Sequence, residues 1–466
     1  PGAAAARSFA CGGCMTRIDT RTLLAIGGLL AVGAVLRVGW VLRAYGSDGA
    51  WTQLAYPDEE AYVRAAAGLA SGQGLIDEFG YRATYMPAYP AFLAIFHGRD
   101  DGLLWARIVQ AVLVAIVGPA TCLLARHVVS AVTGESGDGP PGTAARDRLW
   151  GWVPWLAGGL AAIDPFLVFF SGLLLTEALF AAVFMLGWAF LTPVAVGTAR
   201  ARWCGLGAGV LLLASVMLRP SAAIVLVLAV PVLVVVSRAR PVTIGQLGIA
   251  AVVMIVGLAP WAIRNRIVVG EWVWLTTRGG ISLYDGVRPG ATGGSDLADT
   301  KTWPEVQELS ETQWNAYFAR RAREAIIAEP GRIARLAVAK FLRTWSLVPN
   351  VAEHRAGRSA VISAAWMAVV LAAAAVGAWR IRRTWRVGCF LIWPVVGFTL
   401  VHMIFVGSVR YRVPTMPCLY VLAAIGVASI GRWPGKTSSR GADSAGAPQA
   451  VASPDPNPAQ SEYSSQ

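Results

Sequence analysis

The chain has 466 residues, of which 56% are hydrophobic and 14% are charged, and its mean hydropathy is +0.54. Soluble proteins carry roughly 25% charged residues, so this composition, with apolar runs of about twenty residues, excludes an ordinary soluble enzyme. The net charge of +13 does not require nucleic acid, because arginine collects in cytoplasmic loops and beside lipid headgroups. We therefore expect an all-α polytopic membrane protein that contacts membrane lipids and binds no nucleic acid.

Apolar runs of spanning length recur along the sequence, and basic residues mark one side of them. Arg17 and Arg21 precede the first run, which places the N-terminus in the cytoplasm because short cytoplasmic loops are rich in Arg and Lys. We expect about ten transmembrane helices with both termini inside. They are 23–42, 103–129, two within 150–191 that turn near Asp164-Pro165, 203–218, 222–236, 244–260, 361–379, 387–406 and 413–430.

The remaining segments define the expected domain organisation. Cys11 and Cys14 form a lone C-x-x-C near the N-terminus, and without a second pair this is a weak metal or redox signal. Met15-Thr-Arg-Ile would suit the start of a membrane protein. The expected units are a flexible cytoplasmic N-terminus (1–20), a transmembrane domain (21–436) with exoplasmic loops 43–102 and 261–358, and a disordered cytoplasmic tail (437–466) rich in Ser, Pro, Gln and Gly. Within the loops, 58–70, 313–328 and 332–345 are expected to be helical.

Three consecutive acids, Asp58, Glu59 and Glu60, follow the first span in a chain with only 27 acidic residues. Two interpretations are open. Asp58 is a good N-cap for the helix predicted over 58–70, and Glu59 and Glu60 would complement its dipole. Alternatively, Asp58 is a general base that deprotonates an acceptor as it attacks a sugar carbon. Tyr62 shares one face of this predicted helix with other apolar residues, so the helix is expected to lie along the membrane surface.

Two further acids lie within apolar sequence. Acids inside membrane segments are costly and are functional candidates by default. Asp164 precedes Pro165 and would also suit a turn, but we expect it to have a functional role. Glu177 lies deeper in a span, and we expect it to pair with Arg219 inside the bundle in a supporting role.

Two arginine pairs, Arg264 with Arg266 and Arg410 with Arg412, lie where spans meet the exterior. Outside-facing arginines in short loops run against the usual charge bias, and a phosphate partner would account for them. The alternative is that their side chains extend to lipid headgroups. We favour phosphate binding for Arg410 and Arg412, whereas the two interpretations are more evenly matched for Arg264 and Arg266.

Signals for a metal or a soluble nucleotide are weaker. No His-Glu-x-x-His spacing is present, so a catalytic zinc site built from protein ligands alone is not indicated. A divalent ion shared by Asp58, Glu78 or His97 stays open as an alternative. The sequence contains no P-loop and no dinucleotide-binding fingerprint, so use of a soluble nucleotide is not expected.

Several short motifs, in this order and spacing over about 23–430, resemble one superfamily. They are Asp58-Glu59 with Tyr62, Gly72, Gly74 and Pro87-x-x-Pro90; Thr176-Glu177; Leu218-Arg219-Pro220; Pro260-Trp-x-x-Arg264-Asn265 with Gly270; Gly280-Ile-Ser-Leu283-Tyr284; and Arg410-Tyr411-Arg412. Together they are similar to GT-C superfamily membrane glycosyltransferases. The likeness is greatest to bacterial relatives of protein O-mannosyltransferase (glycosyltransferase family 39) and of the lipid A aminoarabinose transferase.

This resemblance implies an enzyme of the cell (plasma or inner) membrane that transfers a sugar with inversion on the exoplasmic side. The donor would be a polyprenyl-phosphate sugar, and the acceptor a lipid, a glycan or a protein. Asp58 would be the catalytic carboxylate, and Asp164, at the second exoplasmic turn, would help to hold the acceptor or a metal ion. The shortness of the segment after Tyr284, with no large soluble domain following the last span, argues against the arabinosyltransferases and oligosaccharyltransferases of the superfamily.

The residues support this chemistry independently, because a leaving phosphate needs cations and an acceptor proton needs a carboxylate. Glu59, Tyr62, Glu177 and Arg219 are expected to support the site. Two other functions stay open. A transporter or flippase of a lipid-linked sugar would favour internal repeats and charges at the membrane midplane. A non-catalytic membrane assembly protein would give no reason for acids and arginines to converge.

Overall fold

The computed structural model describes residues 20–47, 49–135, 150–196, 203–238, 240–297, 303–350, 355 and 357–430. The expectations for Cys11, Cys14, Met15 and the tail from 437 lie outside these residues.

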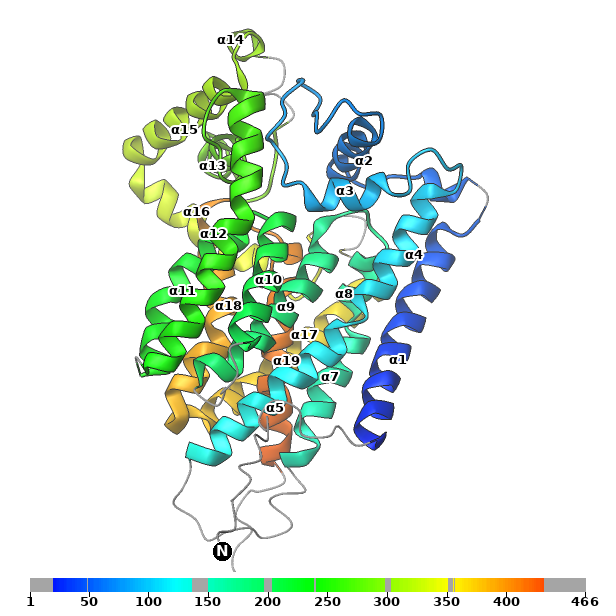
Figure 1. Ribbon diagram of the computed structural model, residues 1–466, viewed down its shortest axis with the longest axis vertical. Helices are drawn as coiled ribbons and strands as arrows, with labels where there is room; N and C mark the ends of the chain where they lie inside the picture. The colour runs from blue at the N-terminus through cyan, green and yellow to red at the C-terminus, as the bar shows by residue number, and fades with distance from the viewer. Residues whose placement is uncertain are drawn as a thin grey trace, which may run out of the picture.

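The described chain folds into a bundle of apolar helices whose long axes run roughly side by side (Figure 1). No strand occurs among the described residues, and the expected all-α architecture is confirmed. The bundle comprises α1 (Thr20–Tyr45), α4 (Gly102–Val114), α5 (Val117–Glu135), α7 (Val153–Ile163), α8 (Pro165–Ser171), α9 (Thr176–Ala195), α10 (Trp203–Leu218), α11 (Ser221–Ser237), α12 (Pro241–Val269), α17 (Arg358–Arg380), η4 (Arg382–Thr384), α18 (Trp385–Ile404) and α19 (Met416–Ile430).

Seven helical segments of the described chain are long and apolar enough to cross a membrane, and α7 with α8 makes an eighth if that bent pair is one span. The helices α10 and α11 are apolar but have only 16 and 17 residues. At 1.5 Å per residue each reaches about 25 Å, somewhat less than the roughly 30 Å of a bilayer core. Eight of the ten expected spans therefore correspond to candidates of full length, with the bent pair counted as one span. The other two, α10 and α11, form one short helical hairpin.

The turn predicted at Asp164-Pro165 is wrong. The chain bends there by 44° and continues as α8, because Pro165 fits the first position of a helix and the Asp164 carboxylate caps it by accepting a hydrogen bond from the Phe166 amide (2.8 Å). The chain reverses only at residues 172–175, immediately before α9. Glu177, rather than Asp164, therefore lies next to the turn.

A layer of shorter helices, which we call the cap, covers one end of the bundle (Figure 1). The helices predicted over 58–70, 313–328 and 332–345 are confirmed as α2, α15 and α16. The cap consists of η1 (Ala50–Thr52), α2 (Pro57–Ala70), α3 (Ala88–Ala94), α13 (Gly279–Val287), α14 (Pro304–Gln307), α15 (Glu311–Ala328) and α16 (Pro330–Thr344), next to the turns η5 (Val409–Tyr411) and η6 (Val413–Thr415) that lead into α19.

Glu311 joins the two halves of the cap, which come from separate parts of the sequence. Its carboxylate accepts hydrogen bonds from the backbone amides of Arg82 and Ala83, both at 2.7 Å, and from the Thr277 hydroxyl. The Thr277 amide in turn donates to the Ala83 carbonyl (3.0 Å). This buried carboxylate therefore fixes residues 82 and 83 against the segment that leads into α13.

Candidate active site

Asp58 lies in the first turn of α2 but does not cap this helix. The N-cap of α2 is Tyr56, and Glu59, at the third helical position, accepts a hydrogen bond from the Tyr56 amide (3.1 Å). The prediction that Asp58 is the N-cap is therefore wrong, because Pro57 takes the first helical position and moves the cap two residues upstream. A role as helix cap would have explained the presence of Asp58 without any catalytic function. Tyr56 and Glu59 have that role instead.

Asp58 instead faces a cluster of charges drawn from distant parts of the chain. Its Oδ2 atom lies 2.8 Å from Arg410 Nη1. Arg410 Nε lies 3.5 Å from Glu177 Oε1, and the same oxygen lies 2.7 Å from Arg219 Nη1. We call Asp58, Glu177, Arg219 and Arg410, with Arg278 described below, the charge cluster. It joins α2, the start of α9, the α10–α11 connection and η5.

Arg278 approaches the charge cluster from the cap, and the sequence did not predict a role for it. It immediately precedes α13 and donates a hydrogen bond to the Tyr85 hydroxyl (2.7 Å), and it acts electrostatically on Asp58. Nothing in the sequence distinguishes it from the other arginines of the 261–358 loop. Its position depends on the Glu311 contacts, which fix the neighbouring Thr277.

Aromatic side chains surround the charge cluster. The Tyr62 ring packs against Tyr85 and Tyr89, with centroids 5.4 and 5.0 Å apart. The Tyr411 ring stacks on His402 (3.9 Å) and lies below the guanidinium groups of both Arg219 and Arg410. Such contacts hold cations in place through the ring quadrupole without neutralising them.

The two acids of the cluster differ in access to solvent. The Asp58 side chain keeps 39% of its surface exposed, whereas Glu177 keeps 4%. Partial burial would by itself raise the pKa of Asp58, but Arg410 and then Arg278 outweigh burial and hold that pKa below its ordinary value. Asp58 is therefore an ionised carboxylate that a bound molecule can reach, and Glu177 is an internal counter-ion for arginines.

Asp164 and Arg412 lie in a different part of the bundle. Asp164 is fully buried and interacts with Tyr420 and Arg37. Arg412 is buried too, and it donates to the carbonyls of Thr344 (3.1 Å) and Ser346 at the end of α16. Because a 3₁₀ turn has three residues per turn, side chains two residues apart diverge. Arg410 and Arg412 therefore point to separate partners.

Arg264 and Arg266 lie on α12 and form no ion pair with Asp58. Arg264 donates to the Arg82 carbonyl (2.6 Å), and Arg266 is exposed. Arg264 lies on an open, shallow surface along one face of α12, together with Pro260, Ile263, Ile267 and Val268, which we call the groove. These five positions follow helical spacing, so the groove is an apolar stripe with one cation.

The residues considered for a metal site do not come together. Glu78 pairs with Arg64 (3.5 Å), His97 is exposed on the chain after α3, and Asp58 pairs with Arg410. Within the described ranges, no group of three or more His, Cys, Asp or Glu residues could hold a metal ion.

The described chain is a polytopic helical bundle with the composition of a membrane protein, and its fold is similar to that of a solved oligosaccharyltransferase. The crystal structure of the Archaeoglobus fulgidus oligosaccharyltransferase tethered to an acceptor peptide matches with a TM-score of 0.53 and 13% sequence identity. The match covers 89% of this chain and 50% of that enzyme, so this chain spans about half the length of that relative.

Two other solved structures are similar at lower TM-scores. The Archaeoglobus fulgidus oligosaccharyltransferase AglB, in complex with an inhibitory peptide and a dolichol-phosphate, has a TM-score of 0.49 and 14% identity over 88% of this chain and 50% of its own. ArnT from Cupriavidus metallidurans, bound to undecaprenyl phosphate, has a TM-score of 0.36 and 13% identity over 88% of this chain and 78% of its own. No protein-family model matches the sequence, and the comparison with curated proteins gives no match.

Proposed function

We propose that the protein is an inverting glycosyltransferase that moves a sugar from a polyprenyl-phosphate donor to an acceptor on the exoplasmic face of the cell membrane. The observation that carries this proposal is the meeting of an accessible carboxylate, Asp58, with the arginines Arg410, Arg219 and Arg278 where the cap joins the bundle. The GT-C-type fold supports it. Transfer from a lipid phosphate needs a base and cations at one membrane depth.

Asp58 is the proposed general base. The acceptor oxygen or nitrogen forms a bond to the anomeric carbon of the sugar while the bond from that carbon to the phosphate oxygen breaks. The electron pair of the broken bond stays on the polyprenyl phosphate, and the acceptor proton passes to the Asp58 carboxylate. A single displacement of this kind inverts the configuration at the anomeric carbon.

The arginines of the charge cluster are the proposed stabilisers of the leaving phosphate. Charge develops on the phosphate as the bond breaks, and preorganised cations lower the barrier most when they lie where that charge appears. Glu177 holds Arg219 and Arg410 in position through contacts of 2.7 and 3.5 Å. We assign no step to Asp164 or Arg412, because their contacts are with Arg37, Tyr420 and the end of α16.

The groove on α12 is the proposed path of the donor lipid. Its apolar members include Ile263 and Ile267, which are 50% and 78% exposed on a membrane-spanning helix. A polyprenyl chain stays in the bilayer, so a stripe of this kind can hold it from the side. Arg264, at the level of the cap residue Arg82, would hold an anionic headgroup beside the chain. Arg266 is exposed and would meet lipid headgroups.

The opposite end of the bundle supports the proposed orientation of the cap toward the exoplasm. Arg380 at the end of α17, Arg382 and Arg383 in η4, and Arg386 at the start of α18 form a short basic connection. Connections of this kind lie in the cytoplasm. Orientation can be tested with a membrane-impermeant thiol reagent on intact cells. Glu60→Cys, on the exposed face of α2, should react before permeabilisation, whereas the exposed native Cys389 near the start of α18 should react only after it. The reverse order would place the cap in the cytoplasm.

The decisive test of activity uses purified protein in lipid nanodiscs with polyprenyl-phosphate sugars that differ in the sugar. Native protein should release polyprenyl phosphate with at least one donor. Asp58→Asn, which removes the base but keeps the side-chain size, should reduce kcat by a factor on the order of 10²–10⁴. Glu60→Gln is the matched control, because the Glu60 side chain is 63% exposed and pairs with Arg64 on the same helix, away from the charge cluster. Undiminished turnover by Asp58→Asn would refute the assignment of Asp58.

A further inference from the structure

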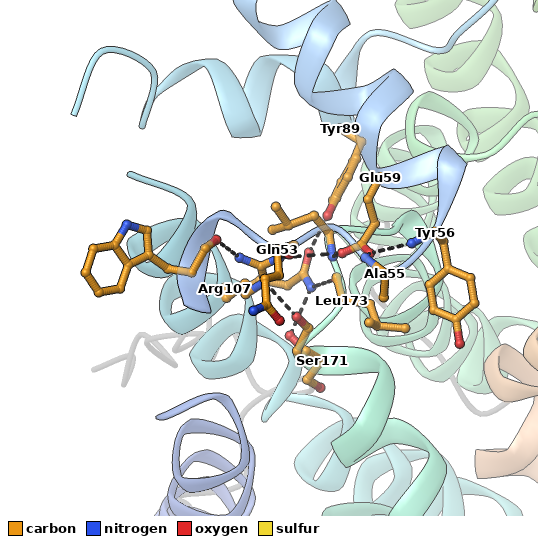
Figure 2. A network of polar contacts seen from close by, with 12 residues as sticks. Gln53, Ala55, Tyr56, Glu59, Tyr89, Arg107, Ser171 and Leu173 are labelled. Carbon is orange, nitrogen blue, oxygen red and sulfur yellow. Dashed lines mark hydrogen bonds and ion pairs between the residues drawn. The ribbon is translucent and has the colours of Figure 1, made fainter. Parts of the chain in front are cut away.

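Asp58 and Glu177, the two acids of the charge cluster, lie on two chain segments that also contact each other outside the cluster. Asp58 is followed directly by Glu59, at the start of α2. Leu174 lies in the turn that precedes α9. Glu177 follows it three residues later, in the first turn of α9. Figure 2 shows that Glu59 lies between these two segments, in a network of polar contacts that reaches α4.

The Glu59 carboxylate binds both segments at once. Oε2 accepts hydrogen bonds from the backbone amides of Ala55 (2.7 Å) and Tyr56 (3.1 Å), and Oε1 accepts one from the backbone amide of Leu174 (2.7 Å). The side chain is fully buried. A buried carboxylate that accepts three amide hydrogen bonds is held in a single geometry, because every alternative would leave polar groups unsatisfied.

Two residues one helical turn apart on α4 bind the carbonyls of the same segments. Arg107 donates to the carbonyls of Trp51 (2.6 Å), Gln53 (2.7 Å) and Gly172 (3.0 Å), and its Nη2 lies 3.7 Å from Glu59 Oε1. Gln110 donates to the carbonyls of Ser171 (3.0 Å) and Leu173 (2.7 Å) and accepts from the Tyr89 hydroxyl (2.8 Å). The contacts of Glu59 and Arg107 thus bridge the approach to α2 and the turn before α9.

We propose that Glu59 is a positioning residue that fixes the turn at 171–175 against α2, and thereby sets the spacing between Asp58 and Glu177. The second half of this inference rests on the proposed function. Consecutive Cα atoms are 3.8 Å apart, so a displacement of Glu59 moves Asp58 with it. Without the hydrogen bond from Leu174, the start of α9 can move. Glu177 then moves with it, and so does Arg410, which pairs with both Asp58 and Glu177.

The test compares Glu59→Gln and Glu59→Asp with Glu60→Gln. Aspartate keeps the charge but is one methylene shorter, so it cannot reach Leu174 and Tyr56 together. If Glu59→Gln does not accumulate as folded protein, Glu59→Asp alone is used. The first measurement is amide hydrogen exchange of the peptide covering 171–177 in nanodiscs. We expect exchange to be at least tenfold faster in the Glu59 variants and unchanged in Glu60→Gln. Native exchange rates in both Glu59 variants would overturn the proposal.

The second measurement is turnover with the donor that the native protein accepts. Misplacement of a reacting group by about 1 Å can cost on the order of 10²-fold in rate, so the Glu59 variants should lose 10–100-fold in kcat with the donor KM within about threefold. A loss confined to KM, or faster exchange with native kcat, would show that the contact is structural only and would overturn the positioning role. Native protein that accepts no donor would refute the proposed function, and hydrogen exchange would still decide whether Glu59 fixes the turn.

Discussion

Arg410 is the residue through which the charge cluster can be tested most sharply. Among the described residues it alone forms ion pairs with both acids, through Nη1 to Asp58 (2.8 Å) and through Nε to Glu177 (3.5 Å). Arg410→Met removes the cation and both contacts while keeping the aliphatic stem. Arg410→Lys keeps the charge, but its single ammonium cannot occupy both positions.

The size of the effect follows from what each variant removes. Loss of one preorganised donor at a developing oxyanion costs about 2.7–4 kcal/mol, which corresponds to 10²–10³ in kcat. Arg410→Met should lie in this range. Arg410→Lys restores the cation without the second contact, so we expect a smaller loss, about tenfold.

The two variants should also differ in pH dependence. Arg410 lowers the pKa of Asp58, so the base stays ionised as the pH falls until that lowered pKa is reached. Without the cation the pKa of Asp58 rises, and the acid limb of the kcat/KM profile should move to higher pH in Arg410→Met but much less in Arg410→Lys. The assay is release of polyprenyl phosphate between pH 4 and pH 8. An unshifted acid limb in Arg410→Met, or equal kcat in all three proteins, would refute this assignment.

Three further predictions concern residues outside the charge cluster. Glu311→Ala leaves the amides of Arg82 and Ala83 without their acceptor, so the free energy of unfolding in detergent should fall by about 2–6 kcal/mol. An unchanged midpoint of thermal unfolding would contradict this. Asp164→Asn should lower the unfolding temperature while kcat of the surviving folded protein stays within about threefold; a loss of kcat above 10²-fold would restore Asp164 to the catalytic site. Arg264→Ala should raise the donor KM about tenfold, and Arg266→Ala less than twofold; equal effects would contradict the groove assignment.

Much of the bundle could be predicted because a bilayer imposes strong rules on sequence. The length of the apolar runs predicted the membrane-spanning helices, and the three amphipathic segments of the loops are helical as expected. The Asp164-Pro165 prediction failed because the same dipeptide suits a chain reversal and a capped kink equally well. Only the packing of α8 against its neighbours decides between them, and sequence periodicity does not contain that information.

Only part of the candidate site could be predicted from the sequence. Asp58, Glu177, Arg219 and Arg410 were identified because charges near apolar segments are rare. Arg278 was missed because its loop contains many arginines, and its place depends on Glu311, 33 positions further along the chain. Glu59 was expected to support the site, but the expectation that it mainly complements the helix dipole did not foresee its bond to Leu174. Contacts between segments so far apart leave no local pattern.

The composition of the charge cluster has a consequence for the progress of the proposed reaction. Three guanidinium groups face two carboxylates, so the cluster has one positive charge in excess. A sugar phosphodiester brings one negative charge and makes the assembly neutral. Transfer of the sugar turns that diester into a monoester with a second negative charge, and the proton taken up by Asp58 removes one negative charge from the protein. The assembly is therefore electrically neutral before and after transfer, and no charge has to enter or leave a site at the edge of the bilayer during the chemical step.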